Sequence, residues 1–227
     1  MPSPQRPGET AMLPHSRPRG LAFTVPFDVA ERLVVLGASP SVVNSAQAAG
    51  AETLSLLTPA QADAARLPAG EILQLAGTER LPLPDGYADH LIVPRLRPYL
   101  LPFVPQELAR ILRPGGGLFL GAPSRWRQPR RPEALSVGSG ARMLQRAGFD
   151  DVHAFAIRHD LLQPRHLVSI AAPEALRWYV RSAYLPASAP GALATRLLVR
   201  LGPHQSLLVL FPATGFAARR AHPRRAA

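Results

Sequence analysis

The chain has 227 residues, of which 47% are hydrophobic and none is cysteine. This length suits one α/β domain with a sizeable buried core, and the missing cysteines exclude disulfide scaffolds, thiolate metal sites and cysteine nucleophiles. No apolar run approaches the ~20 residues of a membrane-spanning helix, and the first residues lack the apolar segment of a secretory signal. We therefore expect a cytoplasmic protein with no membrane span.

The formal net charge of +11 is concentrated in two segments. All 26 basic residues are arginine, a bias that raises the charge without selecting for a polyanionic partner. Residues 113–146 hold seven arginines against one glutamate, a net of +6, and residues 216–227 add +4. Because the excess is local and does not spread over a whole face, the sequence does not favour nucleic acid as the partner.

Both ends of the chain differ in composition from the middle. Residues 1–26 are rich in proline and arginine and contain few large apolar side chains, so we predict a disordered arm. Residues 216–227 predict a second, basic disordered tail. The folded domain is then expected over residues 27–215.

Within this domain, short apolar runs alternate with helix-compatible segments. The run at 33–36 is apolar throughout and ends at Gly37, as expected for a strand buried on both faces. Pro114 and Gly115 predict the turn that ends a preceding helix, with the backbone at positive φ. In chain order we predict a strand at 33–36, a helix at 41–49, strands at 53–57, 72–75 and 90–93, a helix at 105–112, a strand at 118–120, a helix at 136–147, a strand at 152–157, helices at 173–184 and 192–200, and a last strand at 206–211.

Alternation of this kind predicts an α/β fold with a Rossmann-like, doubly wound, seven-stranded and mostly parallel sheet. The segment 160–203 is predicted to be a helical insertion before the last strand. Such an insertion would cap an acceptor pocket or pack against a partner protein.

Three blocks of sequence resemble one protein family. They are TERLPLPDGYAD at 78–89, ELARILRPGGG at 107–117 and LQRAGFDDV at 144–152. In this order and spacing they resemble class I S-adenosylmethionine (SAM) dependent methyltransferases, in particular the ubiquinone and menaquinone methyltransferase-like branch with a methyltransferase domain of type 11. The resemblance covers residues 32–158 or so and implies S-adenosyl-L-methionine as cofactor.

The resemblance also places the cofactor contacts, and the residues there depart from the family pattern. The positions of the family's glycine-rich turn after the first strand are occupied by Gly37, Ala38 and Ser39. The family has an acidic residue just before this turn, and here that position is occupied by Val35. In the family an acidic residue binds the ribose hydroxyls, and here that position is occupied by Leu56. In the family an aspartate contacts the adenine, and here that position is occupied by Gly77. The next residues, Thr78 and Glu79, are candidates to make this contact instead.

The acceptor would lie over the ends of the strands at 90–93 and 118–120. Arg95 and Tyr99 follow the first of these strands, and Arg125 and Trp126 follow the second, so these four are the candidate substrate-binding residues. Asp89 and His90 begin a strand and lie at the wrong end for the chemistry. No catalytic residue and no metal site is predicted.

The sequence leaves three functions open. The first is methyl transfer from SAM to a small-molecule or glycan-type acceptor in a biosynthetic pathway, carried out by positioning for in-line displacement. The second, supported by the departures from the cofactor pattern, is a catalytically inactive methyltransferase-fold protein that acts as partner or regulator of another enzyme. The third is a nucleic-acid-binding protein, supported by the basic segment and tail.

Overall fold

The computed structural model describes residues 31–37, 40–48, 51–57, 71–74, 80–159, 164–183 and 204–222. Its elements follow one another as β1 (Arg32–Leu36), α1 (Pro40–Ala48), β2 (Glu52–Leu57), β3 (Glu71–Gln74), β4 (Ala88–Val93), η2 (Pro98–Phe103), α3 (Gln106–Ile111), β5 (Leu112–Pro123), α4 (Val137–Arg146), β6 (Phe149–His159), β7 (Pro164–Ser169), α5 (Pro173–Ala183), η3 (His204–Leu210) and β8 (Ala213–Arg220). The predicted helix at 192–200, the arm at 1–26 and the last five residues lie outside the described residues.

The strands form one sheet in the order β3-β2-β1-β4-β5-β8-β6-β7. Strands β1 to β5 are paired in parallel, whereas β8 is antiparallel to both of its neighbours, β5 and β6. The predicted doubly wound, mostly parallel sheet is therefore confirmed. An eighth strand, β7, pairs antiparallel with β6 and extends the predicted seven at one edge.

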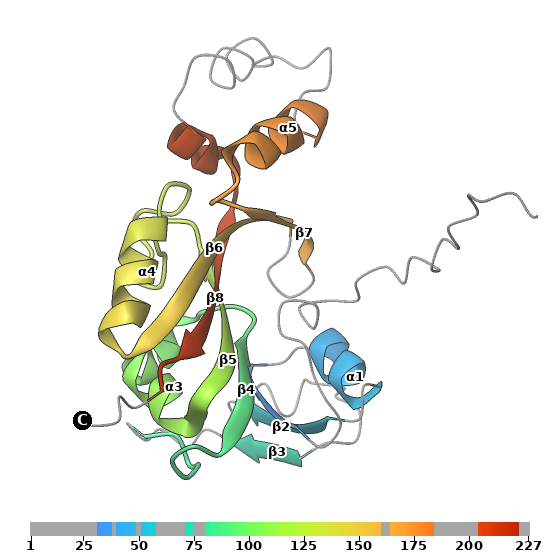
Figure 1. The fold of residues 1–227 in the computed structure, drawn as a ribbon, viewed down its shortest axis with the longest axis vertical. Coiled ribbons are helices and arrows are strands. Elements are labelled where there is room, and N and C mark those ends of the chain that lie inside the picture. Colours follow the sequence, from blue (N-terminus) through green and yellow to red (C-terminus); the bar gives the residue numbers. More distant parts are fainter. Residues whose placement is uncertain are drawn as a thin grey trace, which may run out of the picture.

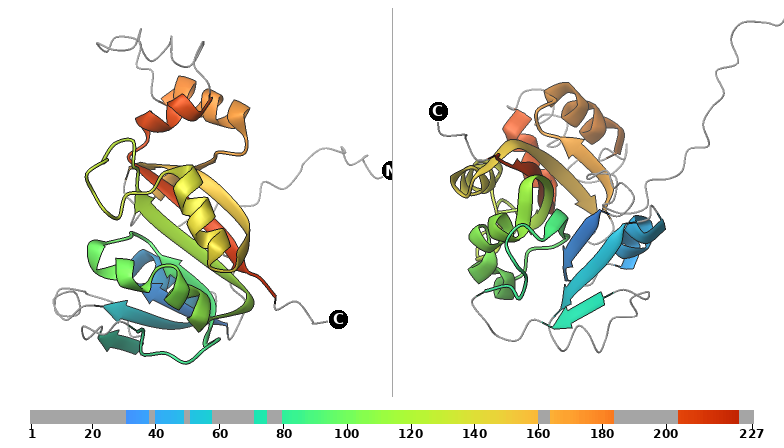
Figure 2. Two further views of the ribbon diagram at one scale, coloured as in Figure 1. Left: turned by 90° about the vertical axis from the view of Figure 1, so that its left-hand side faces the viewer. Right: turned by 60° about the horizontal axis from the view of Figure 1, so that its bottom comes forward.

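Helices cover both faces of the sheet, as a doubly wound fold requires. In β1 the side chains alternate between two buried clusters: Leu33 and Val35 pack with α1, and Val34 and Leu36 pack on the face covered by η2, α3 and α4. Figures 1 and 2 show α3 and α4 on one side of the sheet and α1 on the other. The continuous apolar run is thus explained by burial on both faces.

The last strand was predicted in the wrong place. Residues 206–211 belong mostly to the 3-10 helix η3, and the strand is β8, which extends five residues into the predicted tail at 216–227. A short apolar run such as 207–210 does not distinguish a strand from a buried helical turn. The true strand holds three alanines and one glycine. A side chain has no room at Gly215, where a Cβ would lie only 2.9 Å from Ile157 and 3.0 Å from Phe119.

The predicted helical insertion at 160–203 is only partly helical. It contains β7 as well as α5, and residues 184–203 lie outside the described part. Helices α5 and η3 pack together with the ends of β6 and β7 in a third cluster that includes Leu176, Val180 and Phe211. Figure 1 shows both helices together beyond one end of the sheet.

The turn at Pro114 and Gly115 is a bulge at the beginning of β5. The pairing passes from Ala88 with Leu112 directly to His90 with Gly117, so four residues bulge out opposite one. Gly115 has a φ of +78°, which confirms the predicted positive φ. Across the described residues, no helix has the length and apolar character needed to cross a membrane.

Candidate functional site

The chain reverses its direction of strand addition between β1 and β4. Strands β2 and β3 are added on one side of β1, and β4 and β5 on the other. In open α/β sheets, ligands bind outside the carboxyl ends of the strands at this switch point. The segments that follow β1 and β4 therefore define the candidate site.

Gly37 and Tyr99 meet at this point. Gly37 ends β1 with a φ of +103°, and its N–H donates to the Leu56 carbonyl of β2 at 2.9 Å. The Tyr99 hydroxyl, carried by η2 after β4, lies 4.0 Å from the position that a Cβ on Gly37 would occupy. The structure thus brings together one predicted cofactor residue and one predicted acceptor residue.

Leu56 is a core residue. Its side chain has no exposed surface and packs in the cluster on the α3 and α4 face, while Val35 is equally buried on the opposite face. Glu31 and Glu52 are the described carboxylates nearest in sequence to β1 and β2, and both stand where these strands begin. Within the described residues, no carboxylate is available at the carboxyl ends of β1 and β2 to hold a ribose diol.

The other predicted cofactor contacts, Ala38, Ser39, Gly77, Thr78 and Glu79, lie outside the described residues. They stay predictions.

Of the predicted acceptor residues, Arg95 is half-buried and precedes a fixed point of the backbone. The next residue, Leu96, is fully buried, and its N–H donates to the Gly121 carbonyl of β5 at 2.7 Å. Arg125 and Trp126 are exposed and lie in the connection between β5 and α4, residues 124–135, which we call the β5–α4 loop. All four residues thus follow the carboxyl ends of two adjacent strands.

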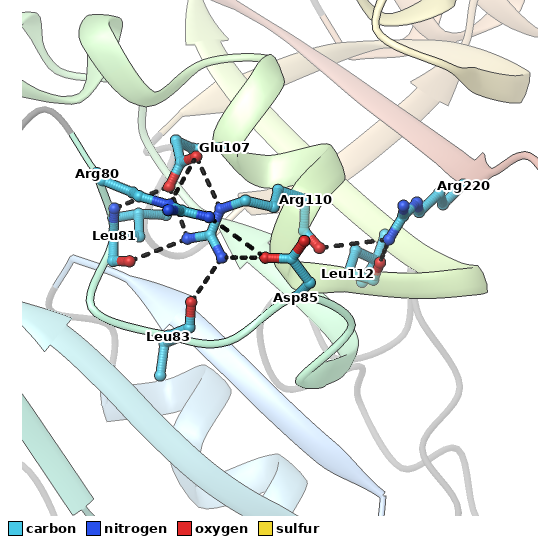
Figure 3. A network of polar contacts seen from close by, with 8 residues as sticks. All are labelled: Arg80, Leu81, Leu83, Asp85, Glu107, Arg110, Leu112 and Arg220. Atoms are coloured by element: carbon cyan, nitrogen blue, oxygen red, sulfur yellow. Dashed lines mark hydrogen bonds and ion pairs between the residues drawn. The ribbon is translucent and has the colours of Figure 1, made fainter.

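A polar network that the sequence analysis missed fixes the segment before β4 (Figure 3). Arg110 of α3 donates to Glu107 through Nε and Nη2, at 2.8 and 2.7 Å, and to Asp85 through Nη1 at 2.8 Å. It also donates to the carbonyls of Leu81 and Leu83 at 3.0 and 2.7 Å. The Leu81 N–H in turn donates to Glu107 at 2.9 Å. The signal in the sequence was the Glu-x-x-Arg spacing on a helix, with an aspartate in the preceding loop.

These bonds shift the acidity of all three charged groups. The hydrogen bond from Arg110 is the main cause that lowers the pKa of both Glu107 and Asp85, and the bond to Glu107 raises the pKa of Arg110. The network extends to β8, because Arg220 donates to the carbonyls of Arg110 and Leu112. The network therefore joins the segments 78–89 and 107–117 to β8 and is a structural feature.

The opposite end of the sheet carries a second charged group. His90 contacts Glu31 at 2.7 Å, and Arg113 forms ion pairs with Glu31 at 3.2 Å and with Asp89 at 2.9 Å. Asp89 and His90 lie at the amino end of β4, as predicted, Glu31 precedes β1, and Arg113 lies at the start of β5, so the group is remote from the switch point.

No family model matches this chain, and no curated protein matches it either. Solved structures with the same fold include a SAM-dependent methyltransferase of Archaeoglobus fulgidus, 15% identical over 86% of this chain and 88% of that one, with a TM-score of 0.53. Phosphoethanolamine N-methyltransferase 2 of Haemonchus contortus, solved with S-adenosyl-L-methionine, is 11% identical over 89% of this chain and 51% of that one, with a TM-score of 0.51. The [4+2]-cyclase SpnF is 19% identical over 89% and 78%, also with a TM-score of 0.51.

The structure therefore has the fold of class I SAM-dependent methyltransferases. The TM-scores of 0.51 to 0.53 establish the fold, whereas identities between 11% and 19% do not establish an activity.

Proposed function

We propose that this chain is a SAM-dependent methyltransferase-like protein of the ubiquinone and menaquinone methyltransferase-like branch, which transfers a methyl group to a small-molecule or glycan-type acceptor. The observation that carries the proposal is the pairing of Gly37 with Tyr99 at the switch point, since a turn without a side chain there leaves room for a ligand to approach the backbone.

The residues at the site divide into two groups. Gly37 would receive the methionine part of SAM, with Ala38 and Ser39 continuing the turn, and SAM when bound would supply an electrophilic methyl group. On the acceptor side, Arg95 and Tyr99 follow β4, and the β5–α4 loop follows β5. The protein's contribution is to hold the acceptor in line with the methyl group.

The ribose end of the site fits less well. A hydrogen bond to a charged group contributes about 1.5–3 kcal/mol, or roughly a 10- to 150-fold change in affinity, and Leu56 provides none. We therefore expect weaker cofactor binding than a site with the carboxylate would give, unless Thr78 or Glu79 replaces this contact.

The burial of Leu56 favours a second candidate. A methyltransferase-fold protein that no longer catalyses and acts as partner or regulator of another enzyme would keep the core residue and lose the carboxylate. The [4+2]-cyclase among the structural neighbours supports the wider point that this fold is used for more than one chemistry.

Calorimetric titration of the full chain with SAM, and with S-adenosylhomocysteine, separates the two candidates. Binding in the micromolar range supports the methyltransferase-like function and justifies a search for the acceptor. No heat of binding with either compound up to millimolar concentration overturns it in favour of the non-catalytic candidate.

A further inference from the structure

The β5–α4 loop is held in one backbone shape. Its two ends are joined, because the Arg125 N–H donates to the Leu135 carbonyl at 3.1 Å and the Leu135 N–H donates to the Pro123 carbonyl at 2.9 Å. Inside the loop, the N–H groups of Arg127 and Gln128 both donate to the Ser124 carbonyl, at 3.1 and 2.9 Å. Further bonds join 131 to 128 and 134 to 131. Side chains on this loop are therefore presented from a fixed base.

The loop is anchored by small and polar side chains and presents large ones to solvent. Ser124, Glu133 and Ala134 are 0%, 3% and 4% exposed, so they hold the loop against the molecule. Trp126, in contrast, is 60% exposed. Its four arginines, Arg125, Arg127, Arg130 and Arg131, are all exposed as well. Trp126 therefore does not pack in the core, and an exposed indole between arginines on an ordered backbone is suited to binding a ligand.

The positive charge of the loop is only partly neutralised. Four arginines against Glu133 leave a net of +3. Arg131 is paired with Glu133 at 3.6 Å, and Arg125 donates to the Arg131 carbonyl at 3.4 Å. Within the described part of the chain, the guanidinium groups of Arg127 and Arg130 have no ion-pair or hydrogen-bond partner. These two exposed guanidinium groups are thus available to an anion.

The loop lies at the same end of the sheet as the switch point. Strand β5 is the neighbour of β4 and two strands away from β1, roughly 10 Å at the usual strand spacing. The Ser124 N–H donates to the Pro212 carbonyl at 2.9 Å, so the loop also joins the segment that follows η3. Figures 1 and 2 show it on the side of the η3 helix. A molecule bound to the loop could therefore extend toward Gly37 and Tyr99.

We propose that the β5–α4 loop binds an acceptor that carries a phosphate-class anion on a ring, with Arg127 and Arg130 contacting the anion and Trp126 stacking on the ring. That the bound molecule is the methyl acceptor rests on the proposed function, whereas the anion site itself does not. Guanidinium groups match the geometry of phosphate oxygens, and an indole face accepts a sugar or aryl ring.

A small acceptor fits this surface better than a nucleic acid strand. Proteins that bind single strands combine a basic groove with several aromatic side chains on which successive bases stack. The loop offers one tryptophan and four arginines, all between residues 125 and 131. A ligand with one ring and one anionic group matches this combination of one tryptophan and several arginines.

The fluorescence of Trp126 reports directly on this site. The chain has two tryptophans, so a Trp178→Phe background leaves Trp126 as the only one. This background would be titrated at constant ionic strength with glucose 1-phosphate and phenyl phosphate, and with glucose, phenol and inorganic phosphate as partial ligands. We expect saturable changes with the two phosphate esters at concentrations at which glucose and phenol give none.

Charge-neutralising variants test the assignment of the arginines. Arg127→Gln with Arg130→Gln should weaken binding of both esters by about tenfold or more. The matched control is Arg142→Gln with Arg146→Gln, which removes two exposed arginines from α4 and should leave binding unchanged. Trp126→Ala, followed by calorimetry, should abolish the preference for phenyl phosphate over inorganic phosphate.

Three results would overturn the proposal: equal binding of glucose and glucose 1-phosphate, equal losses in the loop and α4 variants, or much tighter binding of a single-stranded oligonucleotide that falls steeply between 50 and 200 mM salt. The last result would assign the loop to nucleic acid. Because these titrations contain no SAM, ester binding by a chain that fails to bind SAM supports the anion site and overturns only its role in methyl transfer.

Discussion

Arg110 joins helix α3 to the segment that leads into β4. Its side chain is 14% exposed, and it has five hydrogen bonds to two carboxylates and two carbonyls. Arg80 contacts the same two carboxylates at 3.5 and 4.0 Å, but its side chain is 69% exposed. Desolvation makes the first set of contacts far more important than the second.

Arg110→Ala should lower the free energy of unfolding by about 3 kcal/mol, because it removes two hydrogen bonds to the part-buried Glu107 carboxylate and the side-chain donor of two carbonyls. Arg80→Ala, the matched control, should change it by no more than about 0.5 kcal/mol. Urea unfolding measures both values. Similar losses in the two variants would show that the network contributes only as a surface ion pair.

Glu107 also makes the stability depend on pH. The hydrogen bond from Arg110 holds the pKa of Glu107 below its ordinary value of 4.5 in the folded state, so the charged form favours folding. This contribution is complete above pH 5 or so and is lost as the pH falls through the folded-state pKa. Glu107→Gln should therefore cost about 1.5–3 kcal/mol at pH 7 and less at pH 3, which lies below the ordinary pKa of glutamate. A cost that is the same at both pH values, measured by urea unfolding, would contradict this assignment.

Gly37 is the residue on which the proposed cofactor site depends most directly. Gly37→Ala places a methyl group 4.0 Å from the Tyr99 hydroxyl on a backbone at φ +103° and should weaken SAM binding by tenfold or more. Gly148→Ala is the matched control, since Gly148 has a φ of +88° with open space around its Cβ position. Both variants should lose about 1–2 kcal/mol of stability, and only the first should lose affinity in calorimetry. Equal affinities would remove Gly37 from the site.

Among the elements, α4 is the helix whose sequence and packing agree most closely. Its predicted start is confirmed by Ser136, which caps the helix together with Ser139. Gly140 on its inner side packs on Phe216 of β8, so closely that an added Cβ would fall 2.2 Å from the ring. Gly138 is exposed, and a Cβ there would meet nothing nearer than the end of Arg142 at 3.8 Å.

These two glycines predict opposite effects of one substitution. Gly138→Ala should stabilise the protein by up to about 1 kcal/mol, because alanine is the better helix former. Gly140→Ala should destabilise it by about 1–3 kcal/mol, because the methyl group overlaps the Phe216 ring. Thermal unfolding gives both values, and Phe216→Leu should recover part of the loss in a double variant. Stabilisation by both alanines would mean that α4 does not pack closely on β8 at Gly140.

The sequence predicts the elements whose residues are buried on two faces or capped locally. The strand at 33–36 and the helix at 136–147 are of this kind, and both were found close to their predicted bounds. The β8 segment was missed because its side chains are small, its neighbours supply the burial, and its last two residues are arginines. In the candidate site, Gly37 and Tyr99 were each predicted, but their contact depends on how β1 and β4 pair, which local sequence does not encode.

At the scale of the whole molecule, β8 joins the two halves of the sheet. It pairs with β5 on one side and β6 on the other, and Arg220 at its end donates to two carbonyls at the junction of α3 and β5. Strands β6 and β7, with the α5 and η3 helices beside them, are connected to the parallel half of the sheet through this strand.

Truncation after Pro212 should therefore abolish cooperative folding, because it removes a central strand and leaves β5 and β6 with unpaired backbone groups. Truncation after His222 keeps β8 whole and should retain the midpoint of thermal unfolding within a few degrees. Circular dichroism and calorimetric unfolding of the two shortened chains measure the difference. If the chain ending at Pro212 still unfolded cooperatively, residues 213–220 would be dispensable, as expected for a tail and not for a strand at the centre of the sheet.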